Sequence, residues 1–210
     1  MKIPFTTQQF FEVIEQYNMT VFPAQFIIIL LGIASAILLF TRKDSKNKLI
    51  GSFLGVLWIW TGIAYHFIFF TEINPAAWVF GGLFILQGLA FLFEALIRKR
   101  LAFEIKGQGI DYFAYLFILI GIFIYPVMLF LLEDSLHKTI TLGLPCPSTI
   151  LTFGFLILTS TKFPRYLLII PALWTIVGTS AAINFGVYPD YLMAISALTA
   201  ILYLVFRKRS

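Results

Sequence analysis

Charged residues are scarce in this sequence, and cysteine and histidine are rarer still. Only 12% of the 210 residues are charged, whereas 60% are hydrophobic. The single cysteine, Cys146, excludes an intrachain disulfide. The apolar stretches offer no carboxylate pair, no histidine-rich cluster and no Ser-His-Asp set, so the sequence argues against an enzyme without excluding one.

The few basic residues are strongly clustered. Thirteen of the fifteen lysines and arginines lie in four groups. These groups are Arg42 to Lys48, Arg98 to Lys106, Lys162 with Arg165, and Arg207 to Arg209. Between them run apolar stretches of about 20 residues, the length a helix needs to cross roughly 30 Å of hydrocarbon. We therefore predict an all-α integral membrane protein with seven transmembrane helices, at residues 21–41, 49–70, 76–97, 111–132, 146–161, 166–185 and 188–206.

The placement of the basic groups predicts the orientation of the chain. They follow the first, third, fifth and seventh spans, and basic residues are retained on the cytoplasmic side. We expect a multi-pass protein of the cell membrane with the N-terminus outside and the C-terminus in the cytoplasm. The net charge of +5 does not indicate a nucleic-acid partner, because the basic residues border spans next to the lipid bilayer.

Residues 1–20 precede the seven-helix domain of residues 21–210 and differ from it. Apolar side chains from Phe10 to Tyr17 recur at helical spacing between acidic and amide residues, which is typical of an amphipathic helix at the membrane interface. Thr6 and Gln9 have the spacing of a capping box, and Phe5 with Phe10 that of a hydrophobic staple. An interfacial helix lying on the outer leaflet and a lid over a pore both remain open.

The second and sixth spans share a short pattern. Trp58 is followed by Gly62, and Trp174 by Gly178, at the same spacing. A repeat would make spans one to three and five to seven parallel copies joined by span four, because an odd crossing gives both units one orientation. This 3+1+3 plan resembles that of the small sugar facilitators, in topology alone. A rhodopsin-like retinal protein is excluded, since no lysine lies within a span.

Two motifs carry a resemblance to a known family. The first runs from Ala64-Tyr65-His66 through Asn74-Pro75-Ala76-Ala77, and the second is Gly143-Leu144-Pro145-Cys146-Pro147-Ser148-Thr149. On these segments the chain resembles a family of prokaryotic multi-pass membrane proteins known only as a domain of unknown function. The resemblance implies a shared fold and no activity.

Two residues are candidates for chemistry at the outer side. His66 is an ionisable residue within a span, where such residues usually mark functional sites, although one structural hydrogen bond to another helix would also explain it. Gly51, Gly55 and Gly62 share its helix face, where small residues allow close packing. Cys146 begins the fifth span, where the helix dipole favours a thiolate, or it is a small buried hydrophobe. A metal site on His66 and Cys146 would still lack ligands.

Aromatic and hydroxyl side chains predict a solute site. Trp58, Trp174 and Tyr65 lie on spans two and six, Thr175 lies in the polar stripe of span six, and we predict that they bind a ligand with His66. Filling of the core is the alternative. Because acidic residues within the spans are few, we expect a small neutral solute, bound or passed through an outward-facing site without a cofactor. A metal-handling or thiol-dependent protein, a structural subunit and a homo-oligomer remain open.

Overall fold

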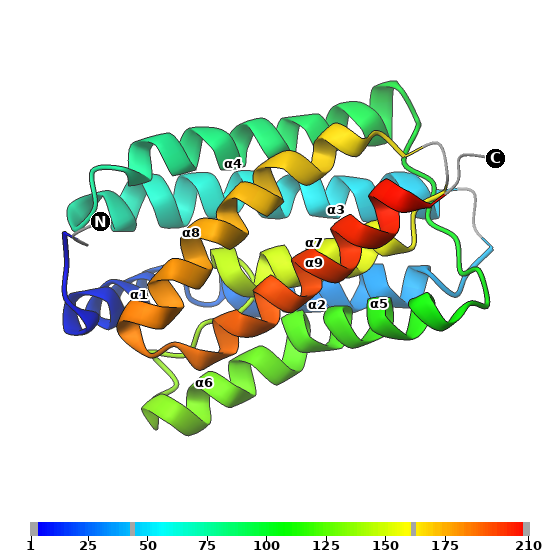
Figure 1. Cartoon of the computed structure of the whole chain (residues 1–210). Helices are drawn as coiled ribbons and strands as arrows, with labels where there is room; N and C mark the ends of the chain where they lie inside the picture. Colours follow the sequence, from blue (N-terminus) through cyan, green and yellow to red (C-terminus); the bar gives the residue numbers. More distant parts are fainter. Residues whose placement is uncertain (1–3, 43–44, 161–162, 208–210) are drawn as a thin grey trace.

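The computed structural model describes residues 4–42, 45–160 and 163–207, and these residues fold mainly into helices (Figure 1). In chain order the α-helices are α1 (Thr7–Val21), α2 (Ala24–Leu38), α3 (Lys46–Trp60), α4 (Ala77–Leu92), α5 (Gly109–Leu119), α6 (Tyr125–Glu133), α7 (Pro145–Ile157), α8 (Ile169–Phe185) and α9 (Tyr191–Phe206). Outside the described residues lie the start of the predicted interfacial helix (1–3), residue 161 of the fifth predicted span, and Lys43, Lys162, Lys208 and Arg209 of the basic groups.

Short segments of π- or 3-10-helix lengthen several of these helices. The π-helix Thr61–Phe69 and the turn Phe70–Glu72 continue α3, and Phe93–Ile97 continues α4. The π-turn Ile120–Ile124 joins α5 to α6 just before Pro126, whose ring cannot continue a regular hydrogen-bond ladder. The 3-10 turns Arg165–Leu168 and Tyr188–Asp190 precede α8 and α9.

Five of the predicted spans are long, apolar helices in the described part of the chain. They are Lys46–Glu72, Ala77–Ile97, Gly109–Glu133, Arg165–Phe185 and Tyr188–Phe206, and all can cross a membrane by length and composition. The number is six if α1 and α2, which bend by 85° at their junction, count as one broken span. The fifth predicted span is shorter than expected, because α7 ends at Ile157.

The reason for the early end of α7 is a contact far away in the sequence. After Ile157 the chain becomes extended, and Thr159 forms an antiparallel bridge with Phe103 in the connection between α4 and α5. Ser160 N donates to the carbonyl of Ala102 at 2.9 Å. Local hydrophobicity cannot reveal this pairing, so the prediction of a helix to residue 161 is wrong at its C-terminal end.

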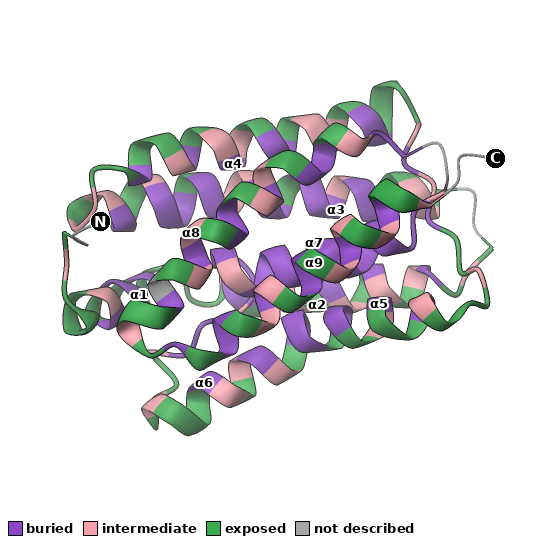
Figure 2. Cartoon of the chain, viewed as in Figure 1, coloured by how far each residue is buried: buried purple, intermediate pink, exposed green. Residues whose placement is uncertain are grey.

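The bundle has α7 at its centre and an apolar outer surface (Figure 2). Every residue of α7 except Cys146 is buried, whereas the other long helices turn side chains such as Trp78, Leu131 and Ile176 outward. Buried hydroxyls in α7 are satisfied by its own backbone, as Thr149 Oγ1 donates to Pro145 O at 2.8 Å. An apolar exterior around a packed interior fits a protein whose solvent is lipid.

The glycines of α3 pack α3 tightly against α4, as predicted. A Cβ on Gly55 would lie 2.9 Å from Gly88 O, and one on Gly88 would lie 2.5 Å from Gly55 O. A side chain at either glycine would therefore push the two backbones apart.

Helix ends gather at two opposite ends of the bundle (Figure 1). We call them the α1 end, which holds α1 and the turn Phe70–Glu72, and the basic end, which holds the connection between α4 and α5 and the end of α9. The predicted capping box of α1 is confirmed, because Gln9 N donates to Thr6 Oγ1 at 3.2 Å and Thr6 N donates to Gln9 Oε1 at 2.9 Å. The staple is confirmed too, with ring centroids of Phe5 and Phe10 6.4 Å apart.

Candidate functional site

A cavity of about 710 Å³ lies at the α1 end. Its walls come from α1 and the residues before it, the π- and 3-10-helical end of the third helix, the start of α4, the segment that leads into α7, the C-terminal two thirds of α8 and the turn before α9. We call it the α1-end cavity. Aromatic rings make up much of its wall: Phe5, Phe10, Tyr65, Phe70, Phe80, Trp174 and Phe185. A few polar side chains interrupt this wall: Asn74, Cys146, Ser180, Asn184 and Asp190.

Cys146 and Asp190 lie together on the wall of the α1-end cavity. The hydroxyl of Tyr125 donates a short hydrogen bond to Asp190 Oδ1, and the thiol of Cys146 lies beside both groups. Cys146 is brought there by the prolines on either side of it, which suit the first turn of α7. Asp190 ends the 3-10 turn Tyr188–Asp190 and is only 4% exposed.

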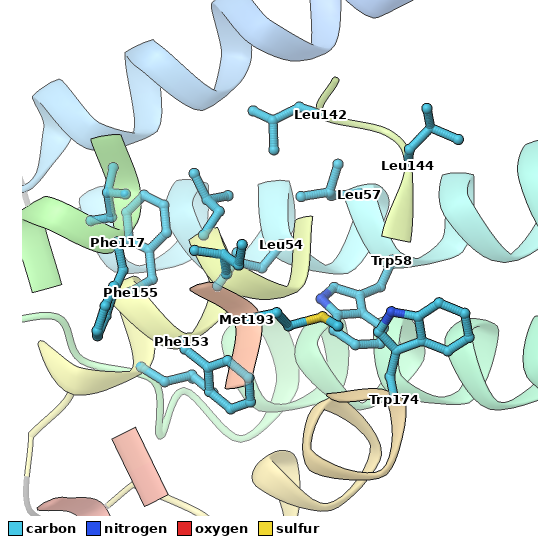
Figure 3. Packing of buried hydrophobic residues seen from close by; sticks show 14 of the residues in the cluster. Leu54, Leu57, Trp58, Phe117, Leu142, Leu144, Phe153, Phe155, Trp174 and Met193 are labelled. Carbon is cyan, nitrogen blue, oxygen red and sulfur yellow. The ribbon is translucent and has the colours of Figure 1, made fainter. Parts of the chain in front are cut away.

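Trp174 is a predicted ligand residue that the structure places on this wall. Its indole nitrogen makes no hydrogen bond to the described residues, although Trp174 is 8% exposed. Gly178 lies beside it, and a Cβ there would lie 2.4 Å from Met193 Cε, 3.6 Å from Trp174 Nε1 and 3.8 Å from Cys146 Sγ, so the missing side chain makes space for Met193. Figure 3 shows the Met193 side chain extending toward the indole rings. A buried donor without a partner next to a cavity is a group that a ligand can satisfy.

Tyr65 also lies on the wall of the α1-end cavity. Its ring stacks on Phe70 with centroids 5.2 Å apart, and Tyr17 meets it edge to face at 6.0 Å. The hydroxyl of Tyr17 in turn donates to Gly143 O at 3.2 Å and accepts from Trp60 Nε1 at 2.8 Å. α1 is thereby fixed to the segment that leads into α7, so it forms part of the wall.

Trp58 lies beneath the α1-end cavity rather than on its wall. It is 1% exposed, its Nε1 donates to Thr152 Oγ1 at 2.9 Å, and its ring packs 4.4 Å from that of Phe84. Figure 3 shows its indole beside that of Trp174. Phe84 also touches Trp174, at a centroid distance of 5.1 Å. Trp58 is therefore a core residue with its donor satisfied, and Phe84 connects it to Trp174 on the wall.

His66 is fully buried in an aromatic cage and does not line the cavity. Its ring lies 4.6 Å from Phe84 and 5.1 Å from Trp174, and neither ring nitrogen has a hydrogen-bond partner in the described chain. The structural hydrogen bond considered for it is thus not made there. His66 and Cys146 both border Trp174, but the described residues contain no group of three His, Cys, Asp or Glu side chains suited to hold a metal.

Thr175, like Trp58 and His66, is a predicted ligand residue that lies away from the wall. Its hydroxyl donates to Pro171 O at 2.9 Å, one turn earlier in α8. Sequence reasoning missed Asp190 and Tyr125 instead. Asp190 follows a proline in a short turn, a pattern typical of an exposed loop. The one signal of another role is its position, because Asp190 is an acidic residue directly before an apolar span.

Comparisons with known proteins place the chain in a family. Neither the curated proteins nor the solved structures give a match. A family model does match, over residues 7–210, which is nearly the whole chain. The chain therefore belongs to a family of unknown function, DUF6064.

Proposed function

We propose that this chain is a seven-span membrane protein that binds a small solute in the α1-end cavity, and that this cavity faces the outside of the cell. The observation that carries the proposal is the cavity itself. Its volume of about 710 Å³ lies within the range of small-molecule sites. Mostly apolar walls with a few convergent polar groups are also typical of such sites.

The arrangement of the helix ends supports seven spans. α1, α2 and α7 are each too short to count as a span alone, yet α2 and α7 both run from the α1 end toward the basic end (Figure 1). α7 is preceded by a buried segment that contains Ile140 and Leu142, so its path through the bundle is longer than its 13 helical residues. Counting both gives an odd number of crossings, which agrees with termini on opposite sides.

The distribution of charge supports the orientation. The connection between α4 and α5, which contains Arg98, Arg100 and Lys106, lies at the basic end, as does the end of α9, which Arg207 follows (Figure 1). Basic residues mark the cytoplasmic side. The α1-end cavity would then open on the outer side, where a solute arrives. The short α7, buried except at Cys146, differs from the partly exposed α2, so the two halves of the proposed 3+1+3 repeat would have diverged strongly.

A stability screen tests solute binding. The purified protein in detergent is heated with sugars, amino acids, amines and small alcohols, because a ligand of the folded state raises the apparent Tm. The variant Ser180→Phe places a ring in the cavity, since Ser180 lines it and bonds only its own helix, at Val177 O. We expect at least one stabilising compound whose effect Ser180→Phe removes.

Thr199→Phe is the matched control. Thr199 is also a partly exposed hydroxyl residue that bonds its own helix, donating to Ile195 O at 2.8 Å, but it does not line the cavity. It should leave the stabilisation unchanged. If no compound stabilises the wild type, or if both variants weaken the effect equally, the cavity is not the binding site.

The thiol-dependent or metal-handling function remains an alternative with a clear requirement. It needs Cys146 and His66 to act on one ion, and both border Trp174. Stabilisation by a soft metal that is lost in both Cys146→Ser and His66→Ala would support it. A structural subunit would tolerate these changes and Ser180→Phe alike.

A further inference from the structure

The carboxyl group of Asp190 is the one acidic side chain on the wall of the α1-end cavity. Asp190 is only 4% exposed, and the Tyr125 hydroxyl donates a hydrogen bond to one of its carboxylate oxygens. The Cys146 thiol lies beside it. Both neighbours are neutral groups, and a carboxylate taken out of water is costly unless an opposite charge compensates it.

No cationic side chain in the described ranges compensates Asp190. The ion pair that the described residues do form joins Arg100 to Glu94 at 2.5 Å, and it lies at the basic end of the bundle. By contrast, Glu94 has both a guanidinium and the Tyr166 hydroxyl, at 2.6 Å, as partners. Glu94 at the basic end is thus paired with a cation, whereas Asp190 at the cavity has no counter-charge among the described residues.

The rings around the cavity suit the same kind of ligand. Phe80 meets Trp174 edge to face at 5.5 Å, and Tyr65 stacks on Phe70. Phe5 and Phe185 stack at 5.1 Å on the side of α1. Aromatic faces attract ammonium groups electrostatically, most strongly where water is excluded, and they also accommodate an apolar body. An anion would meet Asp190, and among the described residues of the wall none is basic and could offset the repulsion.

We infer that the solute of the α1-end cavity is an organic cation, an amine or quaternary ammonium compound with an apolar body, whose charged nitrogen is held by Asp190 and the surrounding rings. This inference rests on the proposed function, because it names the class of solute for the same cavity. It replaces the neutral solute expected from the sequence, where Asp190 counts as a turn residue.

Three ligands of similar shape test the charge. 2-Phenylethylammonium, 2-phenylethanol and 3-phenylpropionate share a phenyl body and differ in carrying a positive, no or a negative charge. Each is titrated into the purified protein at constant ionic strength, and affinity is obtained from the rise in apparent Tm. We expect the ammonium to bind at least about tenfold more tightly than the alcohol, and the carboxylate not to bind.

The variant Asp190→Asn tests whether the Asp190 carboxylate holds the ammonium group. The amide has the size of the carboxyl and can still interact with Tyr125, so the ammonium should lose roughly 30-fold or more in affinity while the alcohol changes little. Asp111→Asn is the control, because Asp111 is also buried, at 3% exposure, but caps α5 at the basic end through Lys106 N and Gln108 N. It should leave ammonium binding unchanged.

The outcomes separate this inference from the proposed function. If the alcohol binds as well as the ammonium and Ser180→Phe removes both, the cavity binds solutes but the cation class is wrong. If none of the three binds and the wider screen is silent, both proposals fail. Should Asp190→Asn not fold, the order of the three ligands on the wild type still decides the charge.

Discussion

The two ends of the bundle differ in how far their polar side chains have hydrogen-bond or charge partners. At the basic end Arg100, Lys106 and Arg207 each donate to an oxygen. Arg207 Nη1 donates to Thr159 O at 2.6 Å and Nη2 donates to Ser160 O, while Lys106 Nζ donates to Ile157 O at 2.9 Å. These carbonyls follow the C-terminus of α7, where backbone groups lack helical partners and cations are favoured.

The cations are held at this end in spite of their desolvation. Burial lowers the pKa of the Lys106 ammonium from its ordinary value, and the positive charge of Arg207 lowers it further. Burial likewise lowers the pKa of the Arg207 guanidinium. The carbonyls therefore compensate an unfavourable placement, which is the pattern of a closed, structural end.

The α1 end keeps unsatisfied groups and open volume. Asp190 faces a cavity without a counter-charge, and the indole nitrogen of Trp174 has no partner in the described ranges. Stability therefore comes mainly from the packed interior and the basic end, whereas binding would come from the α1 end. Variants at the two ends should accordingly separate stability from ligand binding.

Replacing Trp58 or Trp174, the two tryptophans that contact Phe84, by alanine should give the largest effects on stability and on ligand binding. Trp58→Ala empties a packed site and removes the bond to Thr152, so we expect a loss of about 4 kcal/mol in stability. Trp174→Ala borders existing cavity space and should cost less stability, but it should abolish ligand binding. Thermal unfolding and ligand titration of both variants measure this.

Trp78→Ala is the control for the tryptophan pair. Trp78 is 61% exposed on the lipid-facing surface of α4, so its loss should change neither quantity much. Equal losses of binding in Trp58→Ala and Trp174→Ala, with stability retained in both, would contradict the separation.

Arg207→Ala should give the next largest effect. It removes two charge-assisted bonds to the chain after α7, and we expect a loss of about 2 kcal/mol, or roughly 4–8 °C in apparent Tm. Arg98→Ala is the matched control, because Arg98 is exposed and lies over the Phe93 ring at 5.2 Å. Ligand affinity should stay unchanged in both, and a weakened affinity in Arg207→Ala would contradict the division between the ends.

The sequence predicts the long helices well because their signals are local. The third predicted span, residues 76–97, corresponds to the helix from Ala77 to Ile97. The apolar run and the adjacent Arg98 are enough to locate it. The end of α7 is not predictable in this way, because the bridge between Phe103 and Thr159 joins segments that are distant in the sequence.

The site is predicted only in part, for a related reason. Helical spacing indicates which residues share a face, but not whether that face meets a cavity or another helix. Trp174, Tyr65 and Cys146 lie on the wall, whereas Trp58 and His66 lie in the core. The burial of Asp190 depends on contact with Tyr125, 65 residues earlier, and no local pattern reveals it.

Replacing Phe5 by alanine should give the smallest effect, and it should change the access of reagents to the α1-end cavity rather than the stability of the protein. The Phe5 ring contacts Phe70, the first residue of the turn Phe70–Glu72, at 5.4 Å, and Phe185, the last residue of α8, at 5.1 Å. It thus lies at the side of the cavity that α1 covers. Phe5→Ala should open this side and speed the reaction of Cys146, the single cysteine, with a membrane-impermeant thiosulfonate by a factor of about three.

Phe22→Ala is the control for access. Phe22 is 66% exposed, packs on Phe26 and does not line the α1-end cavity, so the rate should not change. The reaction is followed on intact cells, where only an outward-facing thiol is modified. Modification that is equally fast in both variants would mean that α1 does not restrict entry, and modification only after the membrane is opened would place the α1-end cavity on the cytoplasmic side.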